Sequence, residues 1–474
     1  MAFTPTIGLE IHAELATATK MFCRSKNDPD EERPNANVCP ICMAHPGTLP
    51  VVNRDAVKHV LRVGAALGGA LAGQSEFDRK SYFYPDIPKG YQISQYEHPL
   101  VAGGELAGVA ITRVHLEEDT ARSTHTPAGT LVDFNRAGVP LMELVTEPVI
   151  QSAEEAGRFA RALQLLLRTL GASGANLEKG QMRVEANISV SRDSSVYGTK
   201  VEVKNLNSFR SVERAIAYEI ERQSRVIEEG GAVVQETRGW DEGRQQTFSQ
   251  RLKEGSADYR YFPDPDLPPL RLSENPELTP EAITATLPEL PAARRARYAE
   301  RYALKAGDIE HIVNSVERSA FFDALAGELA GDAALVQIAA NYLVSDLTGI
   351  YAKRGGESYA ALDPKAFAAL VRMIAAKELS SRGGKDVLAL LVEEGGDPRE
   401  LATKRGLLLL RDAAALQGFA DAVIAAEPGA VVEYRGGKQA ALEYLVGKAM
   451  QASRGAGDPG ELRELIASRL TESR

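Results

Sequence analysis

The chain is poor in cysteine and tryptophan, and it lacks any long apolar run. Three of its 474 residues are cysteine and one is tryptophan. So few cysteines exclude a disulfide framework and are typical of a protein of the reducing cytoplasm. No stretch of about 18 consecutive apolar residues is present, which argues against a membrane-spanning helix. The opening MAFTPTIGLE also lacks the charged and apolar regions of a secretory signal.

The overall composition is that of a folded, water-soluble protein. Hydrophobic residues make up 44% of the chain and charged residues 25%, a balance that excludes a mainly disordered chain. The length predicts about two to four domains. The formal net charge of −10 excludes a uniformly basic nucleic-acid-binding surface, but it is compatible with a local basic patch.

Two proline-rich stretches mark a change in composition. PDPDLPP and LPELP, which end at Pro269 and Pro291, interrupt regular structure, and the chain beyond them is rich in alanine and leucine at helical spacing. We therefore predict a boundary near residue 292, with a mixed domain over 1–292 and helices beyond it. The last part of the chain, 404–474, holds ten Lys and Arg against nine Asp and Glu, so it is less acidic than the whole chain.

Three segments of the first part alternate between apolar and polar residues. In 7–14, 181–190 and 200–204, one alternate set of side chains is aliphatic and the other is charged or polar. Such strands are expected in a sheet with one buried face and one polar face. The polar face of this sheet is therefore the place to look for ligands.

Helical spacing predicts two helices in the same part of the chain, over 153–170 and from about 208 to 229. Asn207 or Ser208 can cap the second helix, and the pair of glycines that follows can end it. A further amphipathic helix is predicted after Pro459.

Common nucleotide and hydrolase motifs are absent. The sequence contains no G-x-x-x-x-G-K-[ST] phosphate loop, no dinucleotide glycine fingerprint, no H-E-x-x-H zinc helix and no G-x-S-x-G nucleophile elbow. A nucleotide bound by this protein would therefore need a different kind of site.

Acidic residues on the predicted strands are candidate metal ligands. Glu10 and His12 point to one side of the same strand, about 7 Å apart along it. Glu117 and Glu118 belong to the run HLEED, and Glu185 lies between Arg and Asn on another polar strand face. Oxygen-rich ligation suits Mg²⁺ with bound phosphates. A solvated strand face and an exposed turn would give the same pattern.

Cysteines form a second candidate metal site. Cys39 and Cys42 lie in the knuckle C-P-I-C, and Cys23 precedes them. This spacing is typical of zinc, whose structural sites have four protein ligands, so His45 or Asp28 would have to complete the set. The alternative is three reduced thiols with no metal.

The segment 77–95 is dense in tyrosine and charge. Its tyrosines and lysines could stack on or bind a nucleotide or the end of a tRNA. An aromatic strand edge without a ligand would look similar.

Long strings in this sequence resemble a known family, the B subunits of the aspartyl/glutamyl-tRNA(Asn/Gln) amidotransferases (GatB). The resemblance extends in order over essentially the whole chain. The matching strings are IGLEIH (7–12), FDRKSYFYPDIPKGYQISQ (77–95), HLEED (115–119), VDFNRAGVPLMELVTEP (132–148), RVEANISV (183–190), KVEVKNLNSF (200–209), QETRGWDE (235–242) and GSADYRYFPDPDLPPL (255–270).

The resemblance implies a function in the amidation of mischarged tRNA. The B subunit in this family uses ATP to phosphorylate the side-chain carboxylate of Glu-tRNA(Gln) or Asp-tRNA(Asn), and ammonia then displaces the phosphate. The A subunit, an amidase, makes the ammonia from glutamine, and the small C subunit clasps the pair into a heterotrimer. The chemistry is the same for both charged tRNAs, so the sequence leaves open whether one or both are substrates.

The resemblance also implies an α+β fold and a set of functional residues. A cradle domain of antiparallel sheet and helices (1–292) would precede an all-helical domain (293–403) and a tail (404–474) that resembles YqeY proteins and contacts tRNA. Mg²⁺ would be held by Glu10, His12, Glu117, Glu118 and Glu185, among which Glu10, His12, Glu118 and Glu185 would be catalytic.

Further assignments concern the nucleotide, the ammonia route and the tRNA. Residues implied in cofactor binding are Arg79, Lys80, Tyr82, Lys89 and Lys204; the ammonia route would be lined by Arg79, Lys80, Asp86 and Lys89; and tRNA phosphates would contact Lys438, Lys448 and Arg454 in the tail. The chain departs from many members of the family at Cys23-Arg24-Ser25, where those members have C-x-C.

Two other functions are compatible with parts of the pattern. A tRNA-binding scaffold without catalysis would have no need of Glu10, Glu118 and Glu185 together. A zinc hydrolase with an open three-cysteine site would resemble the nucleobase deaminases, but their H-x-E motif is absent.

Overall fold

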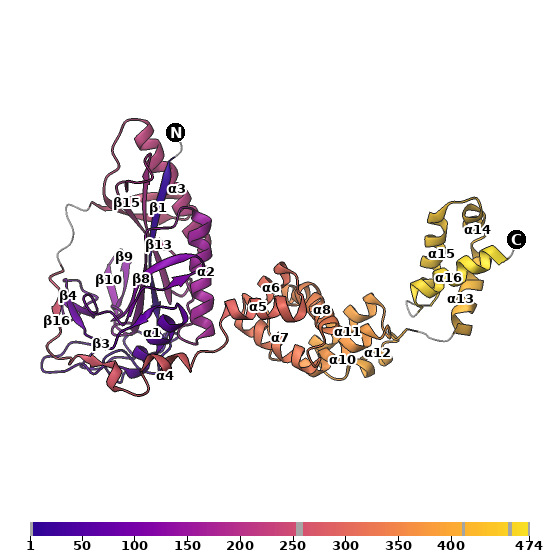
Figure 1. Ribbon diagram of the computed structural model, residues 1–474, viewed down its shortest axis with the longest axis horizontal. Helices are drawn as coiled ribbons and strands as arrows, with labels where there is room; N and C mark the ends of the chain where they lie inside the picture. Colours follow the sequence, from indigo (N-terminus) through magenta and orange to yellow (C-terminus); the bar gives the residue numbers. More distant parts are fainter. Residues whose placement is uncertain (1–2, 253–258, 410–412, 454–456, 473–474) are drawn as a thin grey trace. The chain divides into compact units, whose positions relative to one another are not determined.

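The computed structural model describes residues 3–252, 259–409, 413–453 and 457–472. The chain divides into two compact units, Met1–Pro291 and Ala292–Arg474. The first combines strands and helices, and the second is built from helices (Figure 1).

A large sheet forms the centre of the first unit. Its strands are β1 (Thr4–Glu14), β2 (Ala70–Leu71), β6 (Val101–Ala102), β7 (Glu105–Leu106), β8 (Val109–Glu118), β11 (Pro140–Thr146), β12 (Met182–Ser191), β13 (Val201–Leu206), β14 (Glu236–Asp241) and β15 (Gln246–Leu252). Their order is β15-β14-β13-β12-β1-β11-β8-β6-β2, and β7 pairs with β8 off this path. The helices of this unit are α1 (Arg54–Ala66), α2 (Ala153–Thr169), α3 (Phe209–Glu228), the short α4 (Pro280–Thr284) and the 3₁₀ turn η1 (Leu272–Glu274).

The large sheet is antiparallel apart from one pair. Strands β13 and β14 run parallel because the 20-residue helix α3 connects them and returns the chain to the same end of the sheet. Ser208 is the N-cap of α3, and its Oγ accepts a hydrogen bond from the Ser211 N–H at 3.0 Å.

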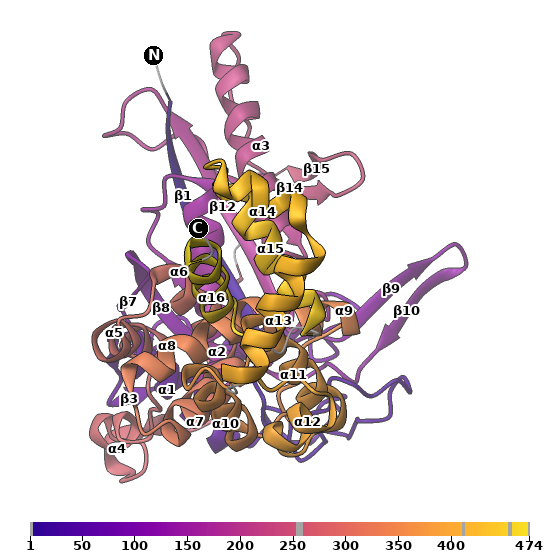
Figure 2. The ribbon, with the colours of Figure 1, turned by 90° about the vertical axis from the view of Figure 1, so that its right-hand side faces the viewer.

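Smaller sheets surround the large one. They are formed by β3 (Gln74–Ser75) with β17 (Leu270–Arg271), by β4 (Asp78–Ser81) between β5 (Tyr91–Ser94) and β16 (Phe262–Pro263), and by the hairpin β9 (Arg122–Thr126) with β10 (Gly129–Asp133). Figure 2 shows that this hairpin projects from the body of the first unit.

One face of the large sheet is buried under helices. Along β1, alternate residues such as Ile7, Leu9 and Ile11 are fully buried, and along β12 Val184 and Ile188 are buried in the same core. Helices α1, α2 and α3 pack their apolar residues into that core (Figure 1). Each large aliphatic side chain buried in this way stabilises the fold by roughly 1.5–3 kcal/mol. The opposite set of side chains is free to build a polar site.

Helices build the second unit in two groups, each with buried residues of its own. The first group is α5 (Pro291–Tyr302), α6 (Ala306–Val313), α7 (Val316–Glu328), α8 (Ala333–Asn341), the π-helical η2 (Tyr342–Leu347), α9 (Thr348–Arg354), α10 (Pro364–Ala375), α11 (Ser381–Glu394) and α12 (Pro398–Lys404). The second group is α13 (Ala413–Ala426), α14 (Pro428–Arg435), α15 (Gln439–Ala452) and α16 (Pro459–Glu472). Its core includes Leu416, Leu445 and Ile466.

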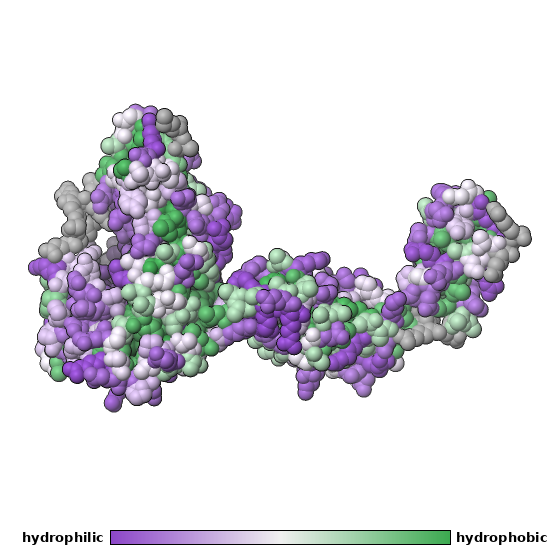
Figure 3. Space-filling view, viewed as in Figure 1, coloured by the Kyte–Doolittle hydropathy of each residue, from purple (hydrophilic) through white to green (hydrophobic). Residues whose placement is uncertain are grey.

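One continuous helix in the second unit is apolar. Elements α8, η2 and α9 run together over Ala333–Arg354, a length and composition that would allow a helix to cross a membrane. Its residues Val336, Leu343 and Leu347 are buried, and it packs against α7, α10 and α11. The visible face of this unit shows hydrophilic patches between small apolar ones (Figure 3). About 33% of its most apolar stretch is buried, so the helix packs on its neighbours through part of its surface.

The predicted α+β fold class, with helices alone after the mixed part, is confirmed. The predicted strands appear as β1, β12 and β13, and the predicted helices as α2, α3 and α16. The separation of domains at 293–403 and 404–474 stays a prediction.

We predict that Ile11→Ala lowers the free energy of unfolding of the first unit by about 2–5 kcal/mol, because the Ile11 side chain is fully buried in the apolar core. Its sequence neighbours Glu10 and His12 point to the opposite, polar face of the sheet. Denaturant unfolding can be followed by the fluorescence of Trp240, the only tryptophan, which is buried in the same core. The control Val196→Ala removes methyl groups from an exposed side chain and should cost less than about 0.5 kcal/mol. Equal losses in the two variants would contradict the burial of this face.

Candidate functional site

The register of the large sheet aligns acidic and imidazole side chains from four strands. His12 on β1 lies opposite Glu143 on β11, and Glu143 lies opposite His115 on β8. On the other side of β1, Glu10 lies opposite Glu185 on β12. Directly paired residues project from the same face of a sheet, so these side chains meet on the face that the helices do not cover.

Glu143 is the centre of this cluster. One of its carboxylate oxygens, Oε2, lies 3.4 Å from His12 Nε2 and 3.3 Å from His115 Nε2. His12 Nε2 is also 3.8 Å from Glu10 Oε1 and 3.9 Å from Glu117 Oε1. Three carboxylates and two imidazoles therefore converge within a few ångströms.

The cluster contains two sets of ligand atoms that could hold a metal ion. Glu10, His12 and Glu143 form one set, and His115, Glu117 and Glu143 form the other, with the atoms of each set within 4.8 Å of one another. The Nδ1 atoms of both histidines are buried and lack a hydrogen-bond partner among the described residues. Carboxylate and imidazole ligands of this kind suit Mg²⁺ or Mn²⁺.

The charges of the cluster are strongly coupled. Burial acts to raise the pKa of the Glu143 carboxyl, but the adjacent His115 and His12 rings outweigh burial and hold that pKa well below its ordinary value. Burial acts to lower the pKa of His12, but the hydrogen bond and charge of Glu143, with the charge of Glu117, raise it to about 9. Burial and the charge of Glu143 raise the pKa of Glu10. Without a cation, His12 thus carries the positive charge that a bound metal ion would supply.

Basic side chains flank the cluster on β12 and β13. Lys204 Nζ lies 2.7 Å from Glu185 Oε2 and 3.4 Å from Glu202 Oε1. Arg183 donates a hydrogen bond to Asp119 Oδ2 at 2.9 Å. Lys204 and Arg183 are therefore already partly neutralised by protein carboxylates.

A polar cavity of about 560 Å³ opens over this face of the sheet. Tyr82, Tyr96, Tyr259 and Tyr261 line it together with the cluster and with Lys80. The rings of Tyr96 and Tyr261 stack at 4.5 Å, and Lys80 Nζ lies 5.0 Å from the centre of the Tyr259 ring. Aromatic faces beside cations are suited to a nucleobase attached to phosphates.

Lys80 remains charged inside this cavity. Burial acts to lower the pKa of its ammonium group, but the charges of Glu117 and Glu143 hold that pKa above its ordinary value. The cavity therefore presents a cation close to the carboxylate cluster. The hydroxyl of Tyr82 donates a hydrogen bond to Gln92 Oε1 at 3.3 Å.

Glu118 and Lys89 lie elsewhere. Successive strand residues point to opposite faces, so Glu118 points away from the side that Glu117 occupies. Glu118 Oε1 accepts a hydrogen bond from the Ile93 N–H at 3.0 Å and lies 2.5 Å from Lys89 Nζ. The structure thus brings Glu10, His12, Glu117 and Glu185 to one face, but not Glu118.

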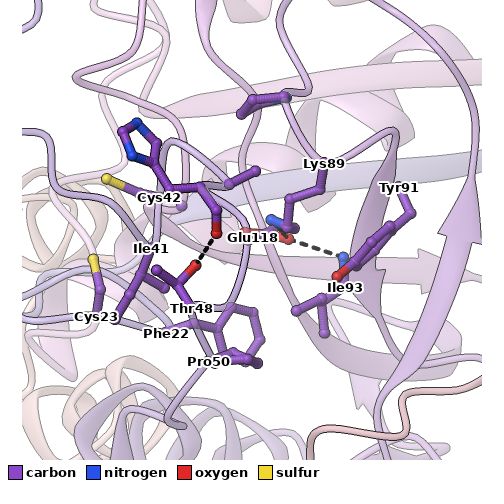
Figure 4. Close-up of a pocket in the computed structure, with 14 residues that line it drawn as sticks. Phe22, Cys23, Ile41, Cys42, Thr48, Pro50, Lys89, Tyr91, Ile93 and Glu118 are labelled. Atoms are coloured by element: carbon purple, nitrogen blue, oxygen red, sulfur yellow. Dashed lines mark hydrogen bonds and ion pairs between the residues drawn. The ribbon is translucent and has the colours of Figure 1, made fainter.

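A second cavity, of about 220 Å³, contains Glu118 and Lys89. Figure 4 shows Cys23 and Cys42 on one side of this cavity and Lys89, Glu118 and Tyr91 on the other. Predicted residues of the nucleotide and zinc sites therefore share a cavity that is distinct from the polar one.

Arg79 is held in place by two aspartates. Its Nε and Nη2 each lie 2.8 Å from a carboxylate oxygen, on Asp264 and Asp266, and its guanidinium lies 4.2 Å above the centre of the Tyr91 ring. Arg79 therefore connects β4 to the segment after β16, and its charge is already balanced.

The three cysteines converge, as a zinc site requires. Their sulfur atoms form one group within 4.8 Å, and the Sγ atoms of Cys39 and Cys42 are 3.8 Å apart. The fully buried Lys20 places its Nζ 3.8 Å from Cys42 Sγ. Among the described residues, no fourth metal ligand joins this group.

The two residues predicted to complete the zinc site differ in position. His45 lines the same cavity as Cys23 and Cys42, but it is outside the ligand group. Asp28 is paired with Lys26 at 2.7 Å and lines a different cavity.

Basic residues of the tail are exposed or half-exposed. Lys438 Nζ lies 2.8 Å from Glu433 Oε2, and Lys448 Nζ lies 3.5 Å from Glu427 Oε1 and 5.4 Å from the centre of the Tyr444 ring. Arg454, the third predicted tRNA contact, is outside the described residues.

Sequence reasoning missed Glu143 and His115 as members of the cluster. Glu143 is the one charged residue in the mostly apolar strand PLMELVT, which is a signal that the sequence contains. His115 precedes Glu117 by two residues, so strand alternation places both on one face. Glu143 and His115 come together because β11 pairs with both β1 and β8. This pairing joins strands that are separate along the chain, so local sequence patterns do not reveal it.

We predict that Glu143→Gln weakens the binding of Mn²⁺, a paramagnetic substitute for Mg²⁺, by at least about tenfold, because Glu143 belongs to both ligand sets. The electron paramagnetic resonance signal of free Mn²⁺ measures this affinity. The matched control Glu118→Gln removes a buried carboxylate from the other cavity and should change the affinity less than about twofold. A larger effect in Glu118→Gln than in Glu143→Gln would contradict the placement of the site.

Comparison with known proteins gives consistent matches along the chain. A family model described as the GatB/GatE catalytic domain matches residues 5–276, and a model described as the GatB domain matches residues 320–470. Similar proteins, each named as the B subunit of an aspartyl/glutamyl-tRNA(Asn/Gln) amidotransferase, come from Thermomicrobium roseum, Thermus thermophilus and Synechocystis. They are 45%, 44% and 41% identical to this chain, with 98–100% of this chain and 97–99% of each relative covered.

Proposed function

The chain belongs to the family of aspartyl/glutamyl-tRNA(Asn/Gln) amidotransferase B subunits, and we propose that it phosphorylates the side-chain carboxylate of Glu-tRNA(Gln) or Asp-tRNA(Asn) so that ammonia can convert it to the amide. The observation that carries this proposal is the cluster of Glu10, His12, His115, Glu117 and Glu143 in a cavity with an aromatic wall.

The reaction joins two anions, which explains the need for such a site. An oxygen of the substrate carboxylate attacks the γ-phosphorus of ATP, the bond to the β,γ-bridging oxygen breaks, and ADP leaves. Ammonia then attacks the carbon of the acyl phosphate, loses a proton, and releases phosphate as the amide forms. The first step requires positive charge between the nucleophile and the phosphates.

The residues of the cluster fit a divalent cation. Each set of three ligand atoms is within 4.8 Å, and the carboxylates of Glu10, Glu117 and Glu143 all lie within 4 Å of an imidazole nitrogen in the cluster. Mg²⁺ held by Glu10, His12, Glu117 and Glu143 would neutralise phosphate charge and orient the phosphates. Glu185, opposite Glu10 and paired with Lys204, would complete the acidic surface at the edge of the site.

The aromatic wall is the proposed site of the adenine base or of the terminal adenosine of tRNA. Tyr82 and Tyr259 meet edge to face at 6.1 Å, and the exposed Tyr96 stacks on Tyr261. Stacking of a base on an aromatic ring contributes roughly 1–3 kcal/mol. Lys80, beside Tyr259, would face the phosphates.

We further propose that the chain works in a heterotrimer with an amidase partner that makes ammonia and a small third protein. The sequence contains no evident glutaminase nucleophile set, so the ammonia has to come from a partner. The cavity that contains Lys89 and Glu118 is our candidate for part of the ammonia route. Arg79, paired with two aspartates, does not line this cavity and would act as a structural residue behind Tyr91, which does.

We propose that the three cysteines are ligands of Zn²⁺. Thiolates that converge on one point bind this metal in preference to the harder metal ions common in cells. Three thiolates and one Zn²⁺ leave a net charge of −1, which the buried Lys20 ammonium would balance.

We expect about one zinc ion per chain in protein purified without chelator, measured by mass spectrometry of the metal content, and its loss in Cys42→Ser. The control Ser195→Ala alters an exposed residue elsewhere and should retain the metal. Protein that is active and contains no zinc would contradict this assignment.

Release of ADP tests the proposed function. In the purified complex with its partner subunits and Mg²⁺, ADP release should require a mischarged tRNA, and Glu185→Ala should lower the rate by about 100-fold or more because a charged group of the acidic site is lost. The control Glu105→Ala removes an exposed carboxylate on β7 and should leave the rate unchanged. ADP release that is equal in wild type and Glu185→Ala would favour the scaffold function.

The tail should bind tRNA through its phosphates. We predict that Lys438→Glu weakens tRNA binding and reduces the slope of log affinity against log salt by about one. Filter binding at several salt concentrations measures both. The control Lys353→Glu makes the same change on an exposed residue of α9, and equal effects in the two variants would contradict a specific contact at Lys438.

A further inference from the structure

Arg113 is a cation of the polar cavity that the assignments above leave unused. It lies on β8 two residues before His115 and lines the same cavity. Its neighbours across the sheet are Val145 on β11 and Ala102 on β6. Both neighbours are apolar, so the register provides no side chain that could pair with the guanidinium.

The guanidinium of Arg113 has no partner among the described residues. No hydrogen bond or ion pair joins it to any of them, and its Nε is buried without an acceptor. Arg183 and Lys204, two other cations of the cavity, are each paired with carboxylates. A buried N–H without an acceptor is costly, so the contrast indicates that the acceptor for Arg113 comes from a ligand.

The simpler explanation is that the stem of Arg113 packs on the sheet while its head is hydrated. That explanation accounts for exposed nitrogens but leaves the buried Nε unexplained. A planar guanidinium with several donors matches the oxygens of phosphate or carboxylate, which it can bind through two parallel hydrogen bonds.

The position of Arg113 favours the phosphates of the nucleotide over the substrate carboxylate as its ligand. The substrate carboxylate has to reach the γ-phosphorus, so it lies at the cluster itself. Arg113 lies about 7 Å farther along the strand from His115, at two residues of about 3.4 Å each, a distance that a triphosphate chain can span. Within the cavity, Arg113 is therefore placed to meet the phosphates that precede the γ-phosphate.

We propose that Arg113 binds the polyphosphate chain of the nucleotide and thereby holds the γ-phosphate at the cluster. This proposal rests on the proposed function, and it assigns to a residue of β8 the role that a phosphate loop has in other nucleotide-binding proteins. Arg113 contacts only the nucleotide in this account, so its loss should weaken nucleotide binding and leave tRNA binding unchanged.

The test measures binding without turnover, in the purified complex with its partner subunits. Titration calorimetry in Mg²⁺ compares β,γ-methylene-ATP, tripolyphosphate and adenosine as ligands. Arg113→Gln should weaken the binding of the first two by about 10- to 100-fold and leave adenosine unaffected. Arg113→Lys, which keeps the charge but loses the planar fork, should give a smaller loss. Near-ultraviolet circular dichroism checks that both variants are folded.

The matched control is Arg192→Gln, which makes the same change at an exposed residue beside Phe3 and should alter no affinity. Unchanged binding of tripolyphosphate and β,γ-methylene-ATP in Arg113→Gln would overturn the proposal. So would a rise in the KM for mischarged tRNA with nucleotide affinity unchanged, which would assign Arg113 to the tRNA. Wild-type ADP release that does not depend on mischarged tRNA would instead refute the proposed function and leave this binding test unaffected.

Discussion

The convergence of negative charge on Glu143 is the constraint on which the rest of the first unit depends. Burying three carboxylates together is unfavourable unless positive charge compensates them. In the structure two imidazoles contact the same oxygen of Glu143, and the charges of Glu143 and Glu117 raise the pKa of His12. The site therefore suits Mg²⁺ and the phosphates that accompany it.

The large sheet makes this arrangement possible by separating its two faces. On one face, aliphatic residues of β1 and β12 pack under three helices and stabilise the strands. On the other face, the same strands hold carboxylates close together in a fixed register. In a flexible loop, the repulsion between these carboxylates would move them apart. The parallel crossover through α3 adds β13 and β14 to the sheet, and with β13 comes Lys204, which neutralises Glu185.

Much of this unit could be predicted from alternation alone. Alternation placed Glu10 and His12 on one face of the first strand and Glu185 on the polar face of another strand. Only the family resemblance grouped the three residues, and the structure brings them to one face of the sheet. For the run HLEED, however, the prediction combined Glu117 and Glu118, which strand alternation separates into two cavities. Glu143 could not be placed from sequence, because its role comes from pairing with strands that are distant in the chain. The same applies to Arg79, whose two aspartates lie more than 180 residues away.

The proposed function divides the work of the site: the acids would hold the cation, the tyrosines would hold a base, and Arg113 would meet the phosphates. The central claim is that a substrate carboxylate is phosphorylated at this cluster. Transfer of ¹⁸O tests it most directly: mischarged tRNA carrying glutamate labelled in its side-chain carboxylate is amidated by the complex, and the released phosphate is analysed by mass spectrometry. The account predicts one ¹⁸O atom in the phosphate for each amide formed, and both products should fall together in Glu143→Gln. Amide formation with unlabelled phosphate would contradict it.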